Sequence, residues 1–144
     1  NFVTHLLEAE LQRQVYALAE GGGSITAAVL NDCKGRILAG FWGDTVAIDD
    51  GARMTWMRQP HYYMGLYPYT YAVGLVASTA MSLRMQQEGA PAVQRWLQVL
   101  QAGGTRRPLE LMQMAGIEMS TPQPIHDAVA HVGRLVDELE RSFD

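Results

Sequence analysis

The sequence predicts an all-α fold, a multi-helix bundle formed by one domain over residues 1–144. Apolar residues recur every three or four positions along most of the chain, which is the spacing of one helix face. No segment alternates between apolar and polar residues over a useful length, so strands are not expected. Glycine and proline divide the periodic segments into short helices, and short links favour antiparallel neighbours.

The first two predicted helices have clear ends. Asn1 is placed to cap the first helix, and Gly21–Gly23 end it. Ser24 is predicted to cap the second helix, which Gly43 and Asp44 close. The residues expected to be buried are Val3, Leu7, Leu11, Val15 and Leu18 in the first helix, and Ile25, Val29, Ile37, Leu38 and Phe41 in the second.

Proline shapes the middle of the chain. A short helix predicted over Asp50–Arg58 runs into Pro60, which pushes the residue before it into an extended conformation. The segment His61–Gly65 is therefore expected to be a loop. A long helix is predicted over residues 66–87, and Pro68 is tolerated in it because the first turn needs no donor from that position.

Three more helices are predicted in the second half. One begins at Pro91 and ends at Gly103 and Gly104, and a short one covers Pro108–Ala115. The segment Pro122–Pro124 opens the last helix. Its stripe, expected to be buried, is Ile125, Val129, Val132, Leu135, Val136 and Leu139.

The composition excludes several classes of protein. Hydrophobic residues make up 48% and charged residues 18%, which indicates a globular chain rather than a disordered one. The net charge of -4 comes without a basic run, so no nucleic-acid partner is expected. Polar residues interrupt the longest apolar stretch, 67–85, so no membrane span is expected. The single cysteine, Cys33, cannot form an internal disulfide and fits a reducing compartment.

One stretch departs from the ordinary helical pattern. Five of the six tyrosines fall within residues 62–71, directly after His61. Tyr67 and Tyr71 are four positions apart, so they share one face of the predicted helix. Buried tyrosines often serve packing alone. A group this dense beside a histidine favours chemistry, because phenol and imidazole donors in a shielded groove stabilise negative charge on a carbonyl oxygen.

The same stretch resembles a signature of the oligoendopeptidase F family. That signature, His-x-Tyr followed by Tyr-x-Tyr-x-Tyr-Ala-x-Gly, stands in this chain as His61–Tyr63 and Tyr67–Gly74. Further family elements occur on both sides in the family's order, so the resemblance covers nearly the whole chain. They are Phe41–Asp44, Trp56–His61, Leu100–Thr105, Pro108–Leu111, Ala115–Ile117 and Pro122–Ile125.

The resemblance implies that the chain is the C-terminal part of a larger helical peptidase, a cytoplasmic, zinc-dependent oligoendopeptidase that hydrolyses short peptides. It implies that His61, Tyr67 and Tyr71 act in catalysis by stabilising the tetrahedral oxyanion. It also implies substrate-binding roles for Tyr63 and Tyr69. The implied reaction is attack on the scissile carbonyl by a zinc-polarised water, with a glutamate as general base.

The zinc-binding motif of the family is missing from this sequence. Such a site needs H-E-x-x-H on a helix, because residues one turn apart converge on one ion, and the chain has no such motif. His5, His126 and His131 are expected to be ordinary surface or boundary residues, and Glu8 and Glu10 to lie on a solvated face. No metal is expected on this chain. Zinc would be held by an upstream catalytic region, and the chain alone is expected to be inactive.

Two other functions use the same residues differently. A freestanding, non-catalytic helical module would bind peptides with the tyrosine-rich stretch. An H-E-x-x-H motif upstream in the same reading frame would distinguish the peptidase from this module. A cysteine nucleophile is disfavoured, because Cys33 lies inside an amphipathic helix with no histidine near it in the sequence.

Overall fold

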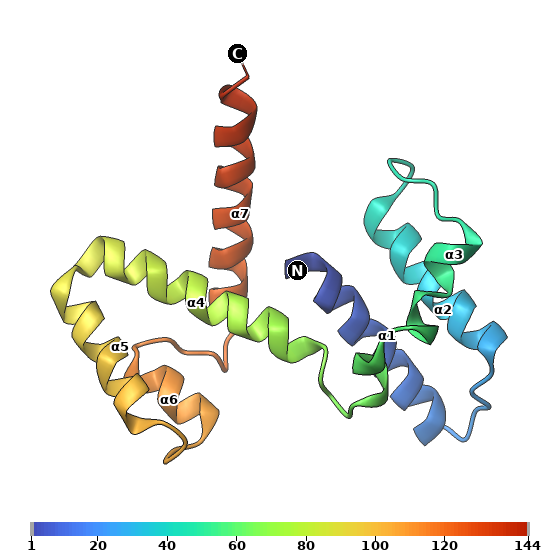
Figure 1. The fold of residues 1–144 in the computed structure, drawn as a ribbon, viewed down its shortest axis with the longest axis horizontal. Coiled ribbons are helices and arrows are strands. Elements are labelled where there is room, and N and C mark those ends of the chain that lie inside the picture. Colours follow the sequence, from blue (N-terminus) through green and yellow to red (C-terminus); the bar gives the residue numbers. More distant parts are fainter. Residues whose placement is uncertain (1, 144) are drawn as a thin grey trace. The chain divides into compact units, whose positions relative to one another are not determined.

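The chain is all-α, as predicted. The computed structural model describes residues 2–143, and within this range it has seven α-helices, two short 3-10 helices and no strand (Figure 1). Asn1, the predicted cap of the first helix, lies outside the described residues. The chain forms two compact units, residues 1–72 (unit 1) and 73–144 (unit 2). That they make up one domain stays a prediction.

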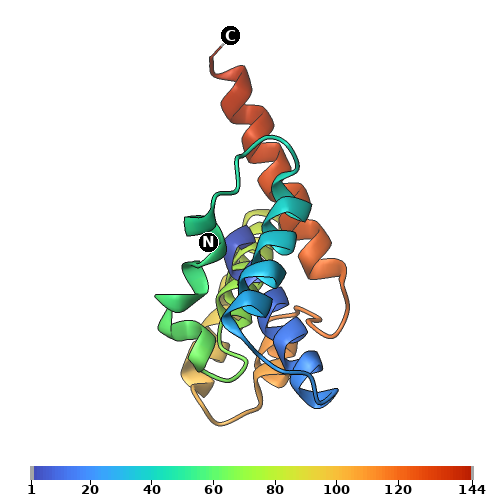
Figure 2. The same ribbon diagram turned by 90° about the vertical axis from the view of Figure 1, so that its right-hand side faces the viewer.

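Unit 1 is built on two long helices that pack side by side (Figures 1 and 2). They are α1 (Phe2–Glu20) and α2 (Ala27–Trp42), and they agree with the two helices predicted first. The short helix α3 (Asp50–Arg53) packs on α2, with Asp49 capping it through the N–H of Ala52. Two 3-10 helices follow, η1 (Thr55–Met57) and η2 (Pro60–Tyr63).

The beginning of α2 differs from the prediction. Thr26, not Ser24, is the cap: its backbone is extended and its hydroxyl accepts a hydrogen bond from the N–H of Val29 at 3.3 Å. The helix therefore starts later than expected, which leaves Ile25 outside it and 47% exposed. Phe41, also predicted to be buried, is 46% exposed and packs edge-on against the ring of Trp42.

The segment after Pro60 also departs from the prediction. It forms the turn η2 rather than a loop, because proline fits the first position of a helical turn. The next long helix, α4 (Tyr69–Glu88), begins three residues later than predicted. Pro68 disfavours helical backbone at Tyr67, so the helix starts only after it. Leu66 turns the chain with a φ of 53°, a value rare for residues with a side chain.

Unit 2 contains most of α4, then α5 (Ala90–Ala102), α6 (Pro108–Met114) and α7 (Gln123–Arg141). The glycine- and proline-based predictions of these helices are confirmed to within a few residues. Its core brings α4, α5 and α6 together with the segment after α6. The core residues are Met81, Ala92, Val99, Ala115 and Ile117, each at most 6% exposed.

The predicted burial of the α7 stripe is wrong. All six of its apolar residues, from Ile125 to Leu139, are between 40% and 60% exposed. The buried residues of α7 are Pro124 and Ala128, both in its first turns. Its charged Asp127 and Arg134 line a hollow of unit 2.

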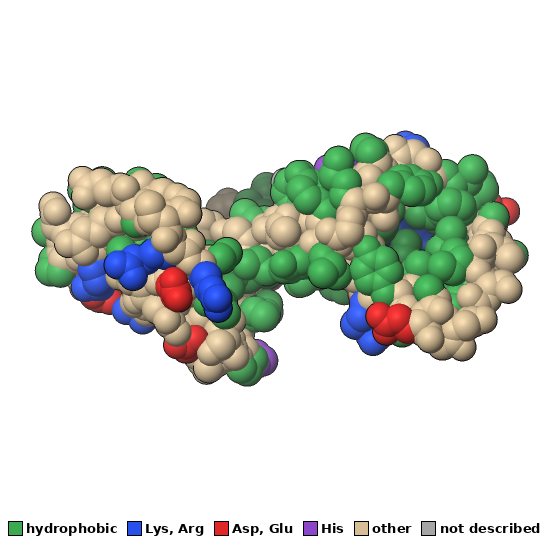
Figure 3. All heavy atoms as spheres, turned by 90° about the horizontal axis from the view of Figure 1, so that it is seen from below, with side chains coloured by type: hydrophobic (Ala, Val, Ile, Leu, Met, Phe, Trp, Pro, Cys, Tyr) green, Lys and Arg blue, Asp and Glu red, His purple; other side chains and the backbone are tan. Residues whose placement is uncertain are grey.

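The surfaces of the two units differ in character. In the view of Figure 3, hydrophobic side chains cover much of unit 1, whereas charged side chains of both signs gather on unit 2. Within residues 2–143, no helix combines the length and the apolar character that crossing a bilayer requires.

The core of unit 2 predicts a contrast between two truncations. Met81→Ala removes a side chain that is 2% exposed, so the free energy of unfolding should fall by about 2–5 kcal/mol. Leu100→Ala removes a side chain that is 58% exposed, so its effect should stay below about 1 kcal/mol. Urea unfolding followed by circular dichroism measures both. Equal losses for the two variants would mean that this core does not carry the stability of the unit.

Candidate functional site

The structure brings the three predicted catalytic residues together in unit 1. The hydroxyls of Tyr67 and Tyr71 are 2.9 Å apart, and the Tyr71 hydroxyl lies 3.3 Å from Nε2 of His61. We call these three residues the His61 cluster. Their ring centroids are 5.3 to 5.7 Å apart, so all three side chains are in mutual contact. Their catalytic role stays a prediction.

The backbone around Leu66 allows the three side chains of the His61 cluster to contact one another. His61 lies in η2, Tyr67 lies between the left-handed Leu66 and the buried Pro68, and Tyr71 lies in the first turn of α4. Tyr67 is thus outside the helix in which it was predicted to share a face with Tyr71. The two hydroxyls still meet, because the turn at Leu66 brings the Tyr67 ring alongside the start of α4.

Helix α1 contributes a residue that the sequence did not assign to the site. The ring of His5 lies 4.4 Å from the ring of Tyr71, tilted by 36°. His5 was expected to be an ordinary boundary residue, and it is half-buried. Its contact fixes one side of the Tyr71 ring, while the contacts with His61 and Tyr67 fix others.

Three buried polar side chains hold the segment that carries His61. Glu8 accepts a hydrogen bond from Nε2 of Gln59 at 2.7 Å. Gln12 donates to the backbone carbonyls of Tyr62 and Met64, at 3.3 and 2.9 Å. We call Glu8, Gln12 and Lys34 the buried polar set, since each is at most 5% exposed.

Lys34 completes this set from α2. Its ammonium donates to the Tyr62 hydroxyl at 2.8 Å and lies 5.4 Å from the centre of that ring. With Gln12 on its carbonyl and Lys34 on its hydroxyl, Tyr62 is fixed at both ends. Because Tyr62 follows His61 directly, the backbone that carries His61 is fixed with it.

The prediction that Glu8 lies on a solvated face is wrong. Its side chain is 2% exposed and lies on the same buried face of α1 as Leu11 and Gln12. Residues three and four positions apart share a helix face, so the burial of Leu11 and Gln12 includes Glu8. Glu10 lies on another face, where it pairs with Arg13 at 2.7 Å. That ion pair lowers the pKa of Glu10 to about 2.

The surroundings raise the pKa of two tyrosines, Tyr62 and Tyr71. The hydrogen bond with Tyr67 raises the pKa of Tyr71, with smaller contributions from burial and from the charge of Glu8. Burial raises the pKa of Tyr62, and the charge of Glu8 adds to the effect. Burial lowers the pKa of Lys34, which the charge of Glu8 opposes. The hydroxyls of Tyr62 and Tyr71 therefore remain hydrogen-bond donors well above neutral pH.

The two residues predicted to bind substrate lie apart from the cluster. Tyr63 is 69% exposed and lines a mostly apolar hollow of about 180 Å³ with Val15, Ile25 and Trp56. Tyr69 is 44% exposed and lines a second hollow of about 400 Å³ between α1 and the start of α4. The structure joins neither hydroxyl to the His61 cluster by a hydrogen bond, and their substrate-binding roles stay predictions.

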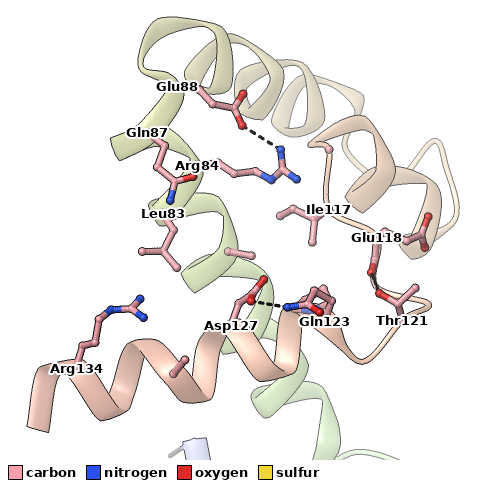
Figure 4. Close-up of a pocket in the computed structure, with 14 residues that line it drawn as sticks. Leu83, Arg84, Gln87, Glu88, Ile117, Glu118, Thr121, Gln123, Asp127 and Arg134 are labelled. Carbon is pink, nitrogen blue, oxygen red and sulfur yellow. Dashed lines mark hydrogen bonds and ion pairs between the residues drawn. The ribbon is translucent and has the colours of Figure 1, made fainter.

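A larger hollow, of about 490 Å³, lies in unit 2 and was not predicted (Figure 4). It is lined by α4, by α7 and by the segment before α7. Arg84 donates to the Glu88 carboxylate at 3.0 Å, and Gln123 donates to Asp127 at 2.7 Å. Four of its charged or polar lining side chains therefore pair with one another.

The remaining candidate groups do not assemble. Among residues 2–143, no three His, Cys, Asp or Glu side chains lie close enough to hold a metal ion. His126 and His131 both lie on α7. Cys33 is buried, and the guanidinium of Arg36 lies 3.3 Å from its sulfur.

Comparison with known proteins identifies the relatives. No protein-family model matches the chain. Oligopeptidase PepF of Bacillus subtilis is 33% identical over 132 residues, which cover 92% of this chain and 20% of that protein. An oligoendopeptidase F of Lactococcus lactis subsp. cremoris is 26% identical over 133 residues, with similar coverage. The chain is homologous to the oligoendopeptidase F family.

A solved structure supports a relationship to peptidases. A candidate peptidase from Chlamydophila abortus matches 96% of this chain with a TM-score of 0.86 and 27% identity. The match covers 23% of that protein, and the chain spans about a fifth of the length of the oligoendopeptidase F relatives. The resemblance inferred from the histidine and tyrosine motifs is therefore confirmed.

The raised pKa of Tyr62 predicts how the tyrosines titrate. The folded chain holds the phenol proton of Tyr62 more tightly than the unfolded chain does. The contribution of Tyr62 to the free energy of unfolding is therefore fully present below pH ~10 and is lost at higher pH. Ultraviolet absorbance of tyrosinate should show a late step to which Tyr62 and Tyr71 both contribute, and Tyr62→Phe should reduce its amplitude. The control Tyr16→Phe should leave the amplitude of the late step unchanged. An unreduced late step in Tyr62→Phe would contradict the prediction.

Proposed function

We propose that this chain is part of an oligopeptidase and that the His61 cluster binds the peptide backbone at the reacting bond. The observation that carries the proposal is the contact among His61, Tyr67 and Tyr71 within a homologue of the oligoendopeptidase F proteins. Two phenols and an imidazole that are connected through the Tyr71 hydroxyl, by contacts of 2.9 and 3.3 Å, can engage adjacent groups of one peptide. The substrate would be a short peptide, met in the cytoplasm.

The proposed role of the phenols is to stabilise negative charge. As a nucleophile adds to a peptide carbonyl, the oxygen becomes an anion and its hydrogen bonds strengthen. The hydroxyls of Tyr67 and Tyr71 would donate to this oxygen, since Tyr71 keeps its proton well above neutral pH. Tyr71 is 36% exposed, so a substrate can reach its hydroxyl. His61 would orient Tyr71 and contact the peptide backbone.

A role of zinc is a separate part of the proposal. The described residues offer no group of three ligands for a metal, so they do not fit a zinc site. We infer that any zinc used by the whole protein would be bound outside this chain. The His61 cluster needs no metal for its proposed part, because hydrogen bonding to the carbonyl oxygen is supplied by its own side chains.

The residues around the His61 cluster have two proposed roles, which are to extend peptide binding and to hold the cluster in place. Tyr63 and Tyr69 would extend peptide binding on either side of the cluster, each beside its own hollow. The buried polar set would keep residues 59–64 in place while substrate binds and leaves. The donors must be held rigidly, because donors misplaced by about 1 Å lose much of their effect.

The variant Tyr71→Phe in the full-length protein tests the role of the hydroxyl. We expect kcat for a fluorogenic oligopeptide to fall by about 100-fold or more while KM changes little, because the hydroxyl acts mainly in the transition state. Ser82→Ala removes an exposed hydroxyl of unit 2, outside the cluster, and should leave kcat within a few-fold. A change confined to KM would show that Tyr71 binds substrate and transition state equally.

The isolated 144-residue chain provides a second test. With zinc and the same peptide we expect no turnover, because the described residues lack a group of metal ligands. Fluorescence anisotropy of a labelled peptide measures binding in the same samples. Turnover that a chelator abolishes would contradict the proposal. Tight peptide binding by the isolated chain, together with full activity of the Tyr71→Phe enzyme, would favour a role of this region in peptide binding alone.

A further inference from the structure

Two buried polar atoms in unit 1 lack a hydrogen-bond partner. They are Oε2 of Glu8 and Nδ1 of His61, and they are the only two such side-chain atoms among residues 2–143. Buried polar groups are nearly always paired, so each of these atoms requires an explanation. One is a carboxylate oxygen, which accepts hydrogen bonds, and the other is a ring nitrogen, which donates when it carries the proton.

Three contacts connect these two residues. Gln59, two positions before His61, donates to the other oxygen of Glu8 at 2.7 Å. Tyr71, whose hydroxyl lies 3.3 Å from Nε2 of His61, contacts His5, which lies one helical turn before Glu8. The charge of Glu8 also contributes to the raised pKa of Tyr71, after the larger effects of the Tyr67 hydrogen bond and burial. These contacts connect the carboxylate with the His61 cluster through Gln59 and α1.

Charge and packing fix this carboxylate. Its side chain is 2% exposed, and Lys34, at 4% exposed, supplies the compensating positive charge from α2. Buried charges persist when they are paired and hydrogen-bonded. Lys34 itself is bound to the Tyr62 hydroxyl, so it leaves Oε2 of Glu8 free to accept another donor.

We propose that Glu8 is a positioning residue whose free oxygen accepts the Nδ1 proton of His61 through one bridging water. A neutral imidazole carries one proton, so this contact leaves Nε2 as an acceptor. Nε2 then accepts from the Tyr71 hydroxyl or from a peptide N–H. The cluster would present one acceptor and two phenol donors, which matches the N–H and C=O groups of a peptide. This last consequence rests on the proposed function, whereas the position of the proton does not.

Imidazole nitrogen NMR of the full 144-residue chain tests the proposal. Spectra recorded near pH ~9, where free imidazole is neutral, report which nitrogen of each histidine carries the proton. The His61 signals are assigned by their loss in His61→Gln. We expect the Nδ1–H form of His61 to predominate in the wild-type chain. Predominance of the Nε2–H form would overturn the proposal without any variant of Glu8.

The variant Glu8→Gln tests the cause. Its amide oxygen would keep the hydrogen bond from Gln59, which turns its NH2 group towards Nδ1 and reverses the demand at that atom. The ratio of Nδ1–H to Nε2–H should fall roughly 10- to 100-fold, the range expected for one hydrogen bond to a charged group. A folded Glu8→Gln chain with an unchanged ratio would overturn the proposal.

Glu10→Gln is the matched control. It makes the same change on the same helix, at a side chain paired with Arg13 on another face, and should leave the His61 ratio unchanged. An equal shift in both variants would overturn the proposal, since it would show a general effect of charge. The measurement needs no substrate, so a negative result would not contradict the peptidase proposal. Conversely, an active Tyr71→Phe enzyme would contradict the proposed function but not the proposed proton on Nδ1 of His61.

Discussion

The candidate site depends on burying charge inside a small helical unit. Glu8 and Lys34 are almost fully enclosed, and each holds a different part of the same short segment. An uncompensated buried charge costs several kcal/mol, so removing either partner would harm the other. Apolar side chains in place of Glu8 and Lys34 could fill the same space, but they could not hold the His61 side chain in one orientation. The polar interior favours one geometry over several loosely packed ones.

This arrangement places the cluster between a rigid support and an open surface. Below it, helix α1 presents Glu8 and Gln12 to residues 59–64. Above it, the rings of Tyr67 and Tyr71 reach the surface of unit 1 through the turn at Leu66. The side chains best suited to contact a ligand are therefore held by groups that a ligand does not touch. That separation is typical of sites whose geometry must survive repeated binding.

Local sequence signals predicted the helical class and most helix ends. Glycine and proline gave the boundaries of α5, α6 and α7 to within a few residues, because their backbone limits act without help from distant contacts. The proximity of Tyr67 and Tyr71 was also predictable, although the reason differed. Pro68 restricts Tyr67 as Pro60 restricts Gln59, and this restriction moves the start of α4 from residue 66 to Tyr69.

Burial was harder to predict, because it depends on which faces find a partner. Lys34 falls four positions after Leu30 and four before Leu38, so its place on an apolar face was a signal that could have been used. Glu8 shares a face with Leu11 in the same way. A glutamate at this position is nevertheless predicted to be exposed, because the sequence does not show that Gln59 donates a hydrogen bond to it. Nothing local distinguishes an apolar stripe that is covered from one that is not, as α7 demonstrates.

The uncovered stripe of α7 bears on how firmly the end of the chain is held. Beyond Ala128, the helix keeps its shape through backbone hydrogen bonding and helix propensity, with little packing behind it. Helical segments of about a dozen residues are only marginally stable in water on these terms. In the isolated chain we therefore expect the final turns of α7 to unwind and re-form more readily than the helices around Met81, and their amide hydrogens to exchange with solvent first.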